Sequence, residues 1–357
     1  MSAVCAHTVF ALINHRSKKL INIVIKVILL LSVTVFVCSV SVCPSYFVKE
    51  NCKETFGASN MKERYNFLLL GLDRSERLSD VIMLVSADID KKEITVAQIP
   101  RDTYAEYTSA AYRKLNGAVS SLNGGRAVAD FLENVFKITI DYYITVDLDG
   151  VAKAVDELGG VEVDIPEDMV YEDPYQDLSI ELKAGRQLLD GEKAKQFIRY
   201  RSGYLRGDIA RLDAQKIFLS ALFEKLLSCG FPKLITTSQK LINASESDAP
   251  FAECLKIVSK YTETKAKDIK LITMPGSDVR SAGGAWYYVL NKKETYNVLS
   301  RYFGCQSDIS YVDPDRLLTG VYSKEFNSIY DAQSGYEYKI YTADSINSDG
   351  VEIEMIN

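Results

Sequence analysis

Two neighbouring stretches, 65-YNFLLLGLD-73 and 80-DVIMLVSADIDKKEITVAQIPRDT-103, decide the fold of this chain. The first is a continuous apolar run that ends in Gly-x-Asp, which is typical of a strand buried on both faces. The second predicts two more strands, at 81–87 and 94–99, joined by a turn at 88–92. Together they predict a three-stranded nucleus for a β-sheet.

The rest of the chain alternates between helical and strand patterns. Helices are expected at 126–136, 149–158, 191–199 and 208–227, and strands at 142–146, 161–165 and 269–274. Such alternation predicts an α/β fold, a layered mixed β-sheet with helices on both faces and at least one antiparallel hairpin. We expect this domain to span 65–303, and residues 304–357, rich in Tyr, Ser and Asp, to form a tail or small appendage.

The N-terminal region predicts a membrane anchor. Residues 20–42 form a mostly apolar run long enough to cross about 30 Å of hydrocarbon as a helix. Arg16, Lys18 and Lys19 precede it, so the positive-inside rule places residues 1–19 in the cytoplasm. After a polar linker at 43–64, the folded domain would be extracytoplasmic on a single-pass protein of the cell membrane. A cleaved signal peptide and a buried core helix are the alternatives.

Composition excludes several classes of protein. The net charge of -6 argues against a nucleic-acid partner. The only histidines are His7 and His15, so the main domain has neither a Ser-His-Asp nor a Cys-His centre, and no zinc site with a His ligand. A general base there must be a carboxylate, Lys, Tyr or metal-bound water. Cys229–Cys254 is a candidate disulfide among several possible pairings.

Strand order brings three charged residues to one edge of the predicted sheet. Asp73 ends the first strand, Asp80 begins the second, and Arg101 follows the third. Ligands of α/β sheets tend to bind at the carboxyl ends of strands. Two facing carboxylates suit Mg²⁺, which prefers one or two carboxylates together with substrate phosphates. The alternative is that both Asp residues serve as turn and cap residues.

A second charged group is the segment 199-RYRSGYLRGDIARLDAQ-215, whose basic residues are all arginine. A planar guanidinium can hold two oxygens of a phosphate or carboxylate at once. Arg199 and Arg201 would point to one side of an extended segment. The alternative is a solvated basic face paired with Asp208 and Asp213.

On the following predicted helix, Arg211 and Gln215 begin a stripe that becomes apolar at Phe218 and Leu222. They would face a pocket at the N-terminal end of the helix, where the helix dipole also favours an anion. Arginine forks combined with a paired-carboxylate metal site have the chemistry of a diphosphate site.

These residues lie in motifs that resemble the LytR-CpsA-Psr cell-wall glycopolymer transferases. The resemblance covers about residues 65–303 and the N-terminal span, through "NFLLLGLD", "SDVIMLVSADIDKKEITVAQIPRDTY", "KLNGA", "DYYITVDLDGVAKAVDELGGVEVDIP", "LKAGRQLLDGEKAKQFIRYR" and "RGDIARLDAQ". It implies a membrane-anchored phosphotransferase that moves a glycopolymer of teichoic-acid or capsule type from a polyprenyl (pyro)phosphate lipid to peptidoglycan.

The resemblance also implies roles for individual residues. Asp73 and Asp80 would hold Mg²⁺, with Mn²⁺ as the alternative metal. Asp102 would orient Arg101 or act as a base, and a second set of residues would contact phosphate or substrate: Arg101, Arg199, Arg201, Arg211 and Gln215 as catalytic groups, and Lys114, Asn116 and Arg206 as substrate-binding groups. Two other functions stay open: a polyprenyl-diphosphate glycolipid hydrolase, and a non-catalytic lipid-glycan binding or regulatory protein.

Overall fold

The computed structural model describes residues 61–72, 78–105, 114–173, 178–204, 208–229, 245–250, 253–254, 256–257, 260–261, 264–280, 284–306, 338–349 and 351. Asp73, Arg206 and the predicted membrane span at 20–42 lie outside them. Within the described residues, no helix combines the length and the apolar character that a membrane crossing needs.

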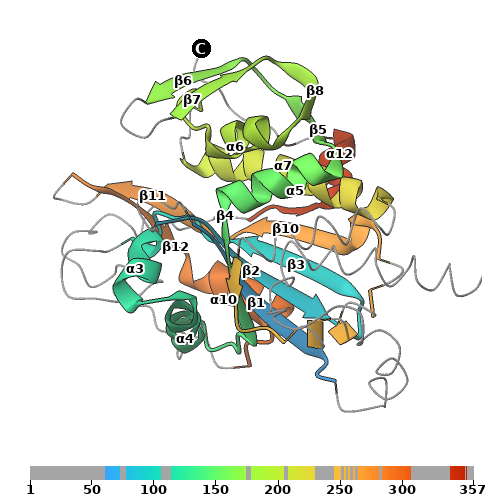
Figure 1. Cartoon of the computed structure of the whole chain (residues 1–357). Helices are drawn as coiled ribbons and strands as arrows, with labels where there is room; N and C mark the ends of the chain where they lie inside the picture. The colour runs from blue at the N-terminus through green and yellow to red at the C-terminus, as the bar shows by residue number, and fades with distance from the viewer. Residues whose placement is uncertain are drawn as a thin grey trace, which may run out of the picture.

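A seven-stranded sheet forms the centre of the molecule (Figure 1). Its order is β13 (Ile340–Thr342), β10 (Ile269–Thr273), β3 (Glu93–Gln98), β2 (Ser79–Asp88), β1 (Arg64–Leu72), β4 (Tyr142–Asp147) and β9 (Ser245–Ser247). β2 is antiparallel to β1 and β3, whereas β4 is parallel to β1 and β10 is parallel to β3. The C-terminal ends of β1, β3, β4 and β10 therefore share one edge with the start of β2, which we call the site edge.

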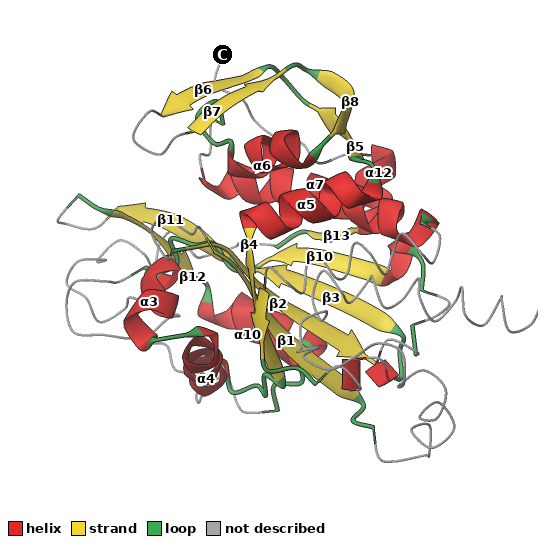
Figure 2. Cartoon of the chain, in the orientation of Figure 1, coloured by secondary structure: helices red, strands yellow, loops and turns green. Residues whose placement is uncertain are grey.

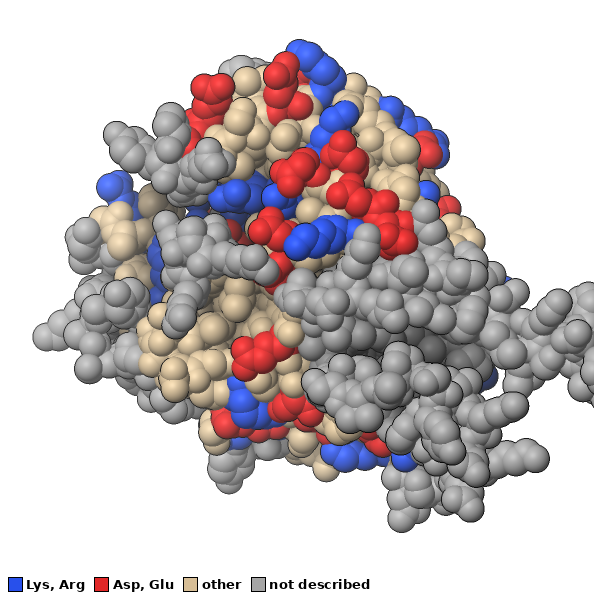
Figure 3. Space-filling model, in the orientation of Figure 1, with Lys and Arg blue, Asp and Glu red and all other residues tan. Residues whose placement is uncertain are grey.

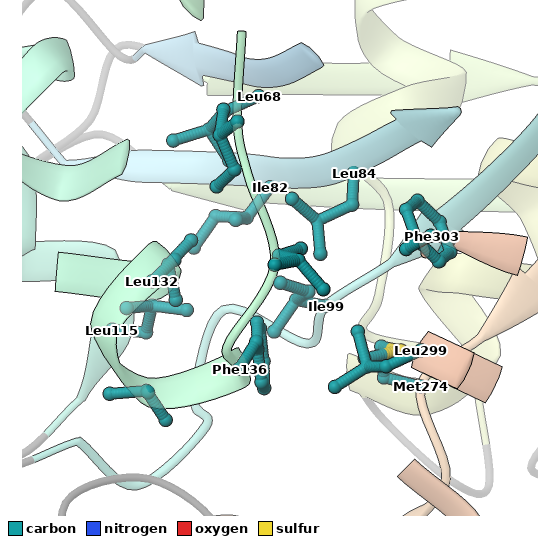
Figure 4. Packing of buried hydrophobic residues seen from close by; sticks show 14 of the residues in the cluster. Leu68, Ile82, Leu84, Ile99, Leu115, Leu132, Phe136, Met274, Leu299 and Phe303 are labelled. Carbon is teal, nitrogen blue, oxygen red and sulfur yellow. The ribbon is translucent and has the colours of Figure 1, made fainter. Parts of the chain in front are cut away.

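Helices cover both faces of this sheet, as the sequence predicts (Figure 2). The lower face packs on α4 (Gly125–Phe136) and α10 (Lys292–Tyr302), and Figure 4 shows part of this core. The upper face packs on α7 (Asp208–Ser228) and α12 (Ala343–Asp349), with α5 (Leu148–Leu158) beside them. β1 alternates between the two: Leu68 and Leu70 belong to the lower core, and Leu69 belongs to the upper one.

Above the sheet, α5 and α7 also support a small lobe. The lobe contains α6 (Gly191–Arg199) and two hairpin-like pairs, β5 (Val161–Ile165) with β8 (Gly185–Leu189) and β6 (Met169–Asp173) with β7 (Leu178–Leu182). Its own core joins residues of these strands to the buried sides of α5, α6 and α7. Of its strands only β5, whose apolar residues at alternate positions are all buried, is predicted from the sequence; β6, β7 and β8 bury fewer residues.

Two further elements differ from the sequence expectations. A hairpin of β11 (Gly276–Arg280) and β12 (Trp286–Leu290) follows β10 and precedes α10. The C-terminal region, expected as a tail or appendage, contributes the edge strand β13 and helix α12, whose Asn347 donates to the Ser220 carbonyl of α7 at 3.3 Å. No disulfide joins Cys229 to Cys254, so that pairing was wrong.

Candidate functional site

Asp80 and Arg101 meet at the site edge, where the sequence places them. Arg101 Nη1 donates to Asp80 Oδ1 at 2.5 Å. The register of β1 and β2 explains the direction of the Asp80 side chain. Gly71 pairs with Val81 and Leu72 pairs with Ser79, so Asp80 is the extra residue of a β-bulge. Gly71 is required opposite the bulge, because a Cβ there would lie 2.8 Å from the Val81 Cβ.

Asp102 extends this cluster away from Asp80. Its Oδ1 lies 3.7 Å from Arg101 Nε, and its Oδ2 accepts a hydrogen bond from Lys114 Nζ at 2.8 Å. The backbone N–H of Asn116 donates to the Arg101 carbonyl at 3.0 Å, which ties the Lys114–Asn116 segment to the loop after β3. Two carboxylates and two cations thus alternate in one partly exposed array. Such a compensated array can rearrange around an anionic ligand.

The start of α7 brings Arg211 and Gln215 into the protein. Both side chains are 3% exposed, so the alternative of a solvated basic face was wrong for Arg211. Asp213, proposed as a partner in that alternative, instead accepts from Lys216 Nζ at 2.6 Å. Gln215 Nε2 donates to the Ile198 carbonyl at 3.4 Å, and its Oε1 has no hydrogen-bond partner among the described residues. A buried amide oxygen in that position is available to a ligand.

Arg199 and Arg201 are arranged differently from the expectation. Arg199 is the last residue of α6, not part of an extended segment, and Tyr200 caps that helix in an extended conformation. Arg199 is half-buried and Arg201 is exposed. The Ile198–Gln215 hydrogen bond places the end of α6 beside the first turns of α7. In Figure 3, Lys and Arg side chains gather at a hollow beneath the upper lobe.

An apolar cavity opens beside these residues. It encloses about 800 Å³ of space free of protein atoms, its mouth included, between the upper face of the sheet and helices α5 and α7. Leu69, Met83, Val155 and Phe218 are among its apolar lining residues, and Gln215 is the polar side chain in the lining. Gly71 and Val81, the cross-strand pair next to the Asp80 bulge, line it too. An apolar ligand portion in this cavity would place its polar end near Asp80 and Gln215.

Three buried polar groups at the site edge were not predicted from sequence. Ser79 Oγ and Gln98 Oε1 have no hydrogen-bond partner among the described residues, and both side chains are fully buried. Gln98 Nε2 donates to the Leu212 carbonyl at 3.3 Å, which links the end of β3 to α7. The sequence feature that could have indicated a buried polar group is Gln98, a single amide at the end of the mostly apolar strand "ITVAQ".

The third of these groups is Tyr204, whose hydroxyl also has no hydrogen-bond partner among the described residues. Burial raises the pKa of Tyr204, the neighbouring Tyr200 raises it further, and Arg211 opposes the rise. Tyr204 is therefore neutral at any physiological pH and sits within electrostatic range of Arg211. Its sequence position, between two expected arginine sites, carried no distinct signal.

The described residues supply only part of the oxygen-donor set that a hard divalent cation needs. Among the described residues there is no group of three or more His, Cys, Asp or Glu side chains that could enclose a metal ion. Mg²⁺ does not need such a cage, since it is usually bound by one or two carboxylates plus substrate phosphates and water. Asp80 supplies one oxygen-donor carboxylate at the site edge. This chemistry suits Mg²⁺ only in the presence of a phosphate ligand.

Fold and site together define an α/β protein whose site suits a ligand with an anionic head and a long apolar chain. The chain belongs to the LytR_cpsA_psr family, whose model matches residues 40–303. TagV of Bacillus subtilis, a polyisoprenyl-teichoic acid–peptidoglycan teichoic acid transferase, is 30% identical over 64% of this chain. This chain spans 60% of that protein's length.

Other comparisons agree on the family. TagU of Oceanobacillus iheyensis, also a polyisoprenyl-teichoic acid–peptidoglycan teichoic acid transferase, is 26% identical over 68% of this chain and 76% of its own length. The crystal structure of B. subtilis TagV superposes with a TM-score of 0.58 at 28% identity, covering 71% of this chain and 99% of the other. TagT bound to LIIa-WTA superposes with a TM-score of 0.56 at 25% identity, covering 67% and 89%.

Proposed function

We propose that this protein transfers a teichoic-acid-type glycopolymer from a polyisoprenyl (pyro)phosphate lipid to peptidoglycan. The observation that carries the proposal is that an apolar cavity lies next to the charged array of Asp80, Arg101, Asp102 and Lys114. Gly71 and Val81, the residue pair next to the Asp80 bulge, line the cavity. The relatives named above act on a lipid of this kind, and a capsule-type polymer would present the same linkage.

The cavity binds the isoprenyl chain of the donor. Burial of each methylene contributes about 0.8 kcal/mol, so a few buried isoprene units supply most of the donor's affinity. The phosphates then lie at the mouth of the cavity, where the Gln215 amide is the polar lining group and Arg211 is one helical turn before it. Arg101, Arg199, Arg201 and Arg211 contribute positive charge that is preorganised for the phosphate oxygens.

Transfer requires one bond to form and one to break. An acceptor hydroxyl of peptidoglycan attacks the phosphorus that carries the polymer, and the bond from that phosphorus to the bridging oxygen breaks, which leaves polyisoprenyl phosphate. Asp102 takes the hydroxyl proton and later releases it to water. Lys114 and Arg101 position the Asp102 carboxylate for this role through their contacts at 2.8 Å and 3.7 Å. Positioning and charge provide the catalysis, as in phosphoryl transfer generally.

Asp80, together with Asp73, would hold Mg²⁺ against the donor phosphates. The bound metal would neutralise charge that develops on the phosphate oxygens. Arg101 compensates Asp80 when no ligand is present.

The reaction takes place at the outer surface of the cell membrane in this proposal. Residues 20–42 anchor the chain, and Arg16, Lys18 and Lys19 hold the N-terminus in the cytoplasm. The first strand, β1, begins at Arg64, at the end of the linker. Lipid-linked donor and wall acceptor are then both accessible to a single-pass protein.

The full chain in detergent, with a polyisoprenyl-diphosphate glycolipid, Mg²⁺ and glycan strands of peptidoglycan, tests the proposal. We expect one polyisoprenyl phosphate released for each phosphodiester-linked glycan formed. Release of glycan phosphate at the same rate without acceptor would indicate a hydrolase. Saturable donor binding with no product would indicate a non-catalytic binding protein. Either result would overturn the transferase proposal.

A further inference from the structure

The β11–β12 hairpin carries an exposed aromatic side chain beside the candidate site. Trp286 is 57% exposed, and it is the only tryptophan in the chain. Arg280 lies directly opposite it in the hairpin, with its Cζ 6.0 Å from the centre of the indole ring. Arg280 Nε also donates to the Gly284 carbonyl at 3.3 Å. The ring and the guanidinium are thus held together at the start of β12.

The two faces of this hairpin have different surroundings. Residues directly opposite in an antiparallel pair share a face, so Trp286 and Arg280 lie on the same face as Asp278, which is also exposed. The other face carries Val279 and Tyr287, which pack on Tyr104. The face that carries Trp286 is buried at Tyr288 and Leu290, whereas its indole, its guanidinium and its Asp278 carboxylate are exposed to solvent.

Main-chain hydrogen bonds join the hairpin to the candidate base. The Tyr288 N–H donates to the Asp102 carbonyl at 2.9 Å, and the Tyr104 N–H donates to the Tyr288 carbonyl at 2.8 Å. On the buried face, the Tyr287 ring centre lies 5.8 Å from Lys114 Nζ, the ammonium that contacts Asp102. A ligand on this hairpin would be held in a fixed relation to the Asp102 carboxylate.

The hairpin and the apolar cavity lie on opposite sides of the sheet. Tyr288 and Leu290 of the hairpin belong to the lower core with Leu68 and Leu70 of β1. Leu69 and Gly71, the alternate residues of the same strand, line the cavity. In phosphoryl transfer the attacking and leaving oxygens are roughly in line. With the leaving lipid phosphate on the cavity side, the attacking hydroxyl must approach from the hairpin side.

We propose that Trp286, Arg280 and Asp278 form a binding subsite for the glycan strand of the acceptor, a proposal that rests on the transferase function above. The indole stacks on the apolar face of a sugar ring, as aromatic rings with a large apolar surface can. Arg280 donates to carboxylate or hydroxyl oxygens, and Asp278 accepts from hydroxyl groups. The subsite selects an acidic amino-sugar chain and holds its next hydroxyl near Asp102.

Because the chain has one tryptophan, its intrinsic fluorescence reports on this subsite without any turnover. The full chain in detergent is titrated with soluble peptidoglycan glycan strands, with the donor glycolipid, and with anionic lipid vesicles. We expect saturable quenching or a spectral shift with the glycan strands alone. Arg280→Ala, which keeps the reporter, should weaken this binding roughly tenfold. Leu188→Ala, at a site 58% exposed on the far lobe, is the matched control and should bind like wild type.

Steady-state kinetics provide the second readout. Trp286→Ala should raise KM for the glycan acceptor roughly tenfold while KM for the donor is unchanged. The inference is overturned if acceptor strands leave the fluorescence unchanged at concentrations that saturate turnover, if only donor or vesicles change it, or if Trp286→Ala has the kinetics of Leu188→Ala. Turnover that persists in those cases leaves the transferase function intact. Glycan binding without transfer would overturn the proposed transferase function, and the proposed glycan-binding subsite would still stand.

Discussion

Arg101 Nη1 lies 2.5 Å from Asp80 Oδ1, across the ends of two antiparallel strands. The β-bulge at Asp80 turns this carboxylate toward the arginine. Both side chains are less than one-fifth exposed. The pair brings the carboxylate proposed to bind a metal into contact with the guanidinium proposed to bind phosphate.

We expect Arg101→Lys to lower turnover by about 10²–10³, because lysine keeps the charge but loses the planar fork that holds two phosphate oxygens. Initial rates at saturating Mg²⁺ measure this effect, and the melting temperature checks the fold. Arg186→Lys is the matched control, since Arg186 pairs with Glu162 on the outer lobe with 76% of its side chain exposed. Equal rates for the two variants would contradict a phosphate role for Arg101.

Arg211→Lys should cost a similar factor of about 10²–10³ in turnover, with little change in KM for the acceptor. Arg211 is 3% exposed at the start of α7, one turn before Gln215. A purely structural arginine would instead lower the melting temperature and leave the rate of the folded fraction unchanged. Rates normalised to folded protein decide between the two.

Filling the apolar cavity should discriminate donors by chain length. Ala154 lines the cavity from α5, and Ala154→Leu would displace two or three methylene groups of a long isoprenyl chain. At about 0.8 kcal/mol for each methylene, the expected loss is about 2 kcal/mol, or roughly thirtyfold in KM. A donor with a very short chain is the control and should be turned over normally. An equal rise in KM for both donors would place the lipid elsewhere.

Asp88 should contribute to the free energy of unfolding at neutral pH and lose this contribution in acid. Burial alone would raise its pKa, but hydrogen bonds from the Lys91 N–H, the Arg64 guanidinium and the Lys91 ammonium prevail and lower it. A lowered folded-state pKa stabilises the fold above the unfolded value, near pH 4, and this contribution is lost as the pH falls further. Asp88→Asn should therefore reduce the unfolding free energy at neutral pH by about 1–3 kcal/mol and by less in acid.

Chemical denaturation at several pH values measures this difference. Asp168→Asn is the control, because Asp168 pairs with Lys183 on the exposed outer lobe and should affect stability little. A constant difference between wild type and Asp88→Asn down to acid pH would show that the carboxylate is not the source.

The C-terminal segment should be part of the folded domain. Ile346 of α12 is 3% exposed in the core that α7 shares with the sheet. Ile346→Ala is expected to lower the unfolding free energy by about 2–5 kcal/mol. Ile340→Ala, on β13 with 41% exposure, is the matched control and should have a smaller effect. Equal, small losses of unfolding free energy for the two variants would indicate that this segment is a tail outside the folded domain.

Local pattern was sufficient for much of the sheet and part of the site. The apolar runs and turn residues of 65–103 predict β1, β2 and β3 with their order and direction, and so predict that Asp80 and Arg101 meet. The helical stripe at Arg211 and Gln215 predicts that both face a pocket; Gln215 lines the apolar cavity, and both side chains are 3% exposed. These features depend on side-chain periodicity within one or two elements, and that periodicity can be read from the local sequence.

The remaining features depend on residues far apart in the chain. The cavity combines Leu69 of β1 with Leu226 of α7, and no local pattern marks their contact. β13 forms only by pairing with β10, about seventy residues earlier, and Tyr204 becomes a buried polar group only after α6 and α7 pack. The sequence by itself determined the strands and the charged edge, because side-chain periodicity is a local property. Only the tertiary structure decided the cavity, the buried hydroxyl and amide groups, and the contact of the β11–β12 hairpin with Asp102, because packing and long-range pairing set them.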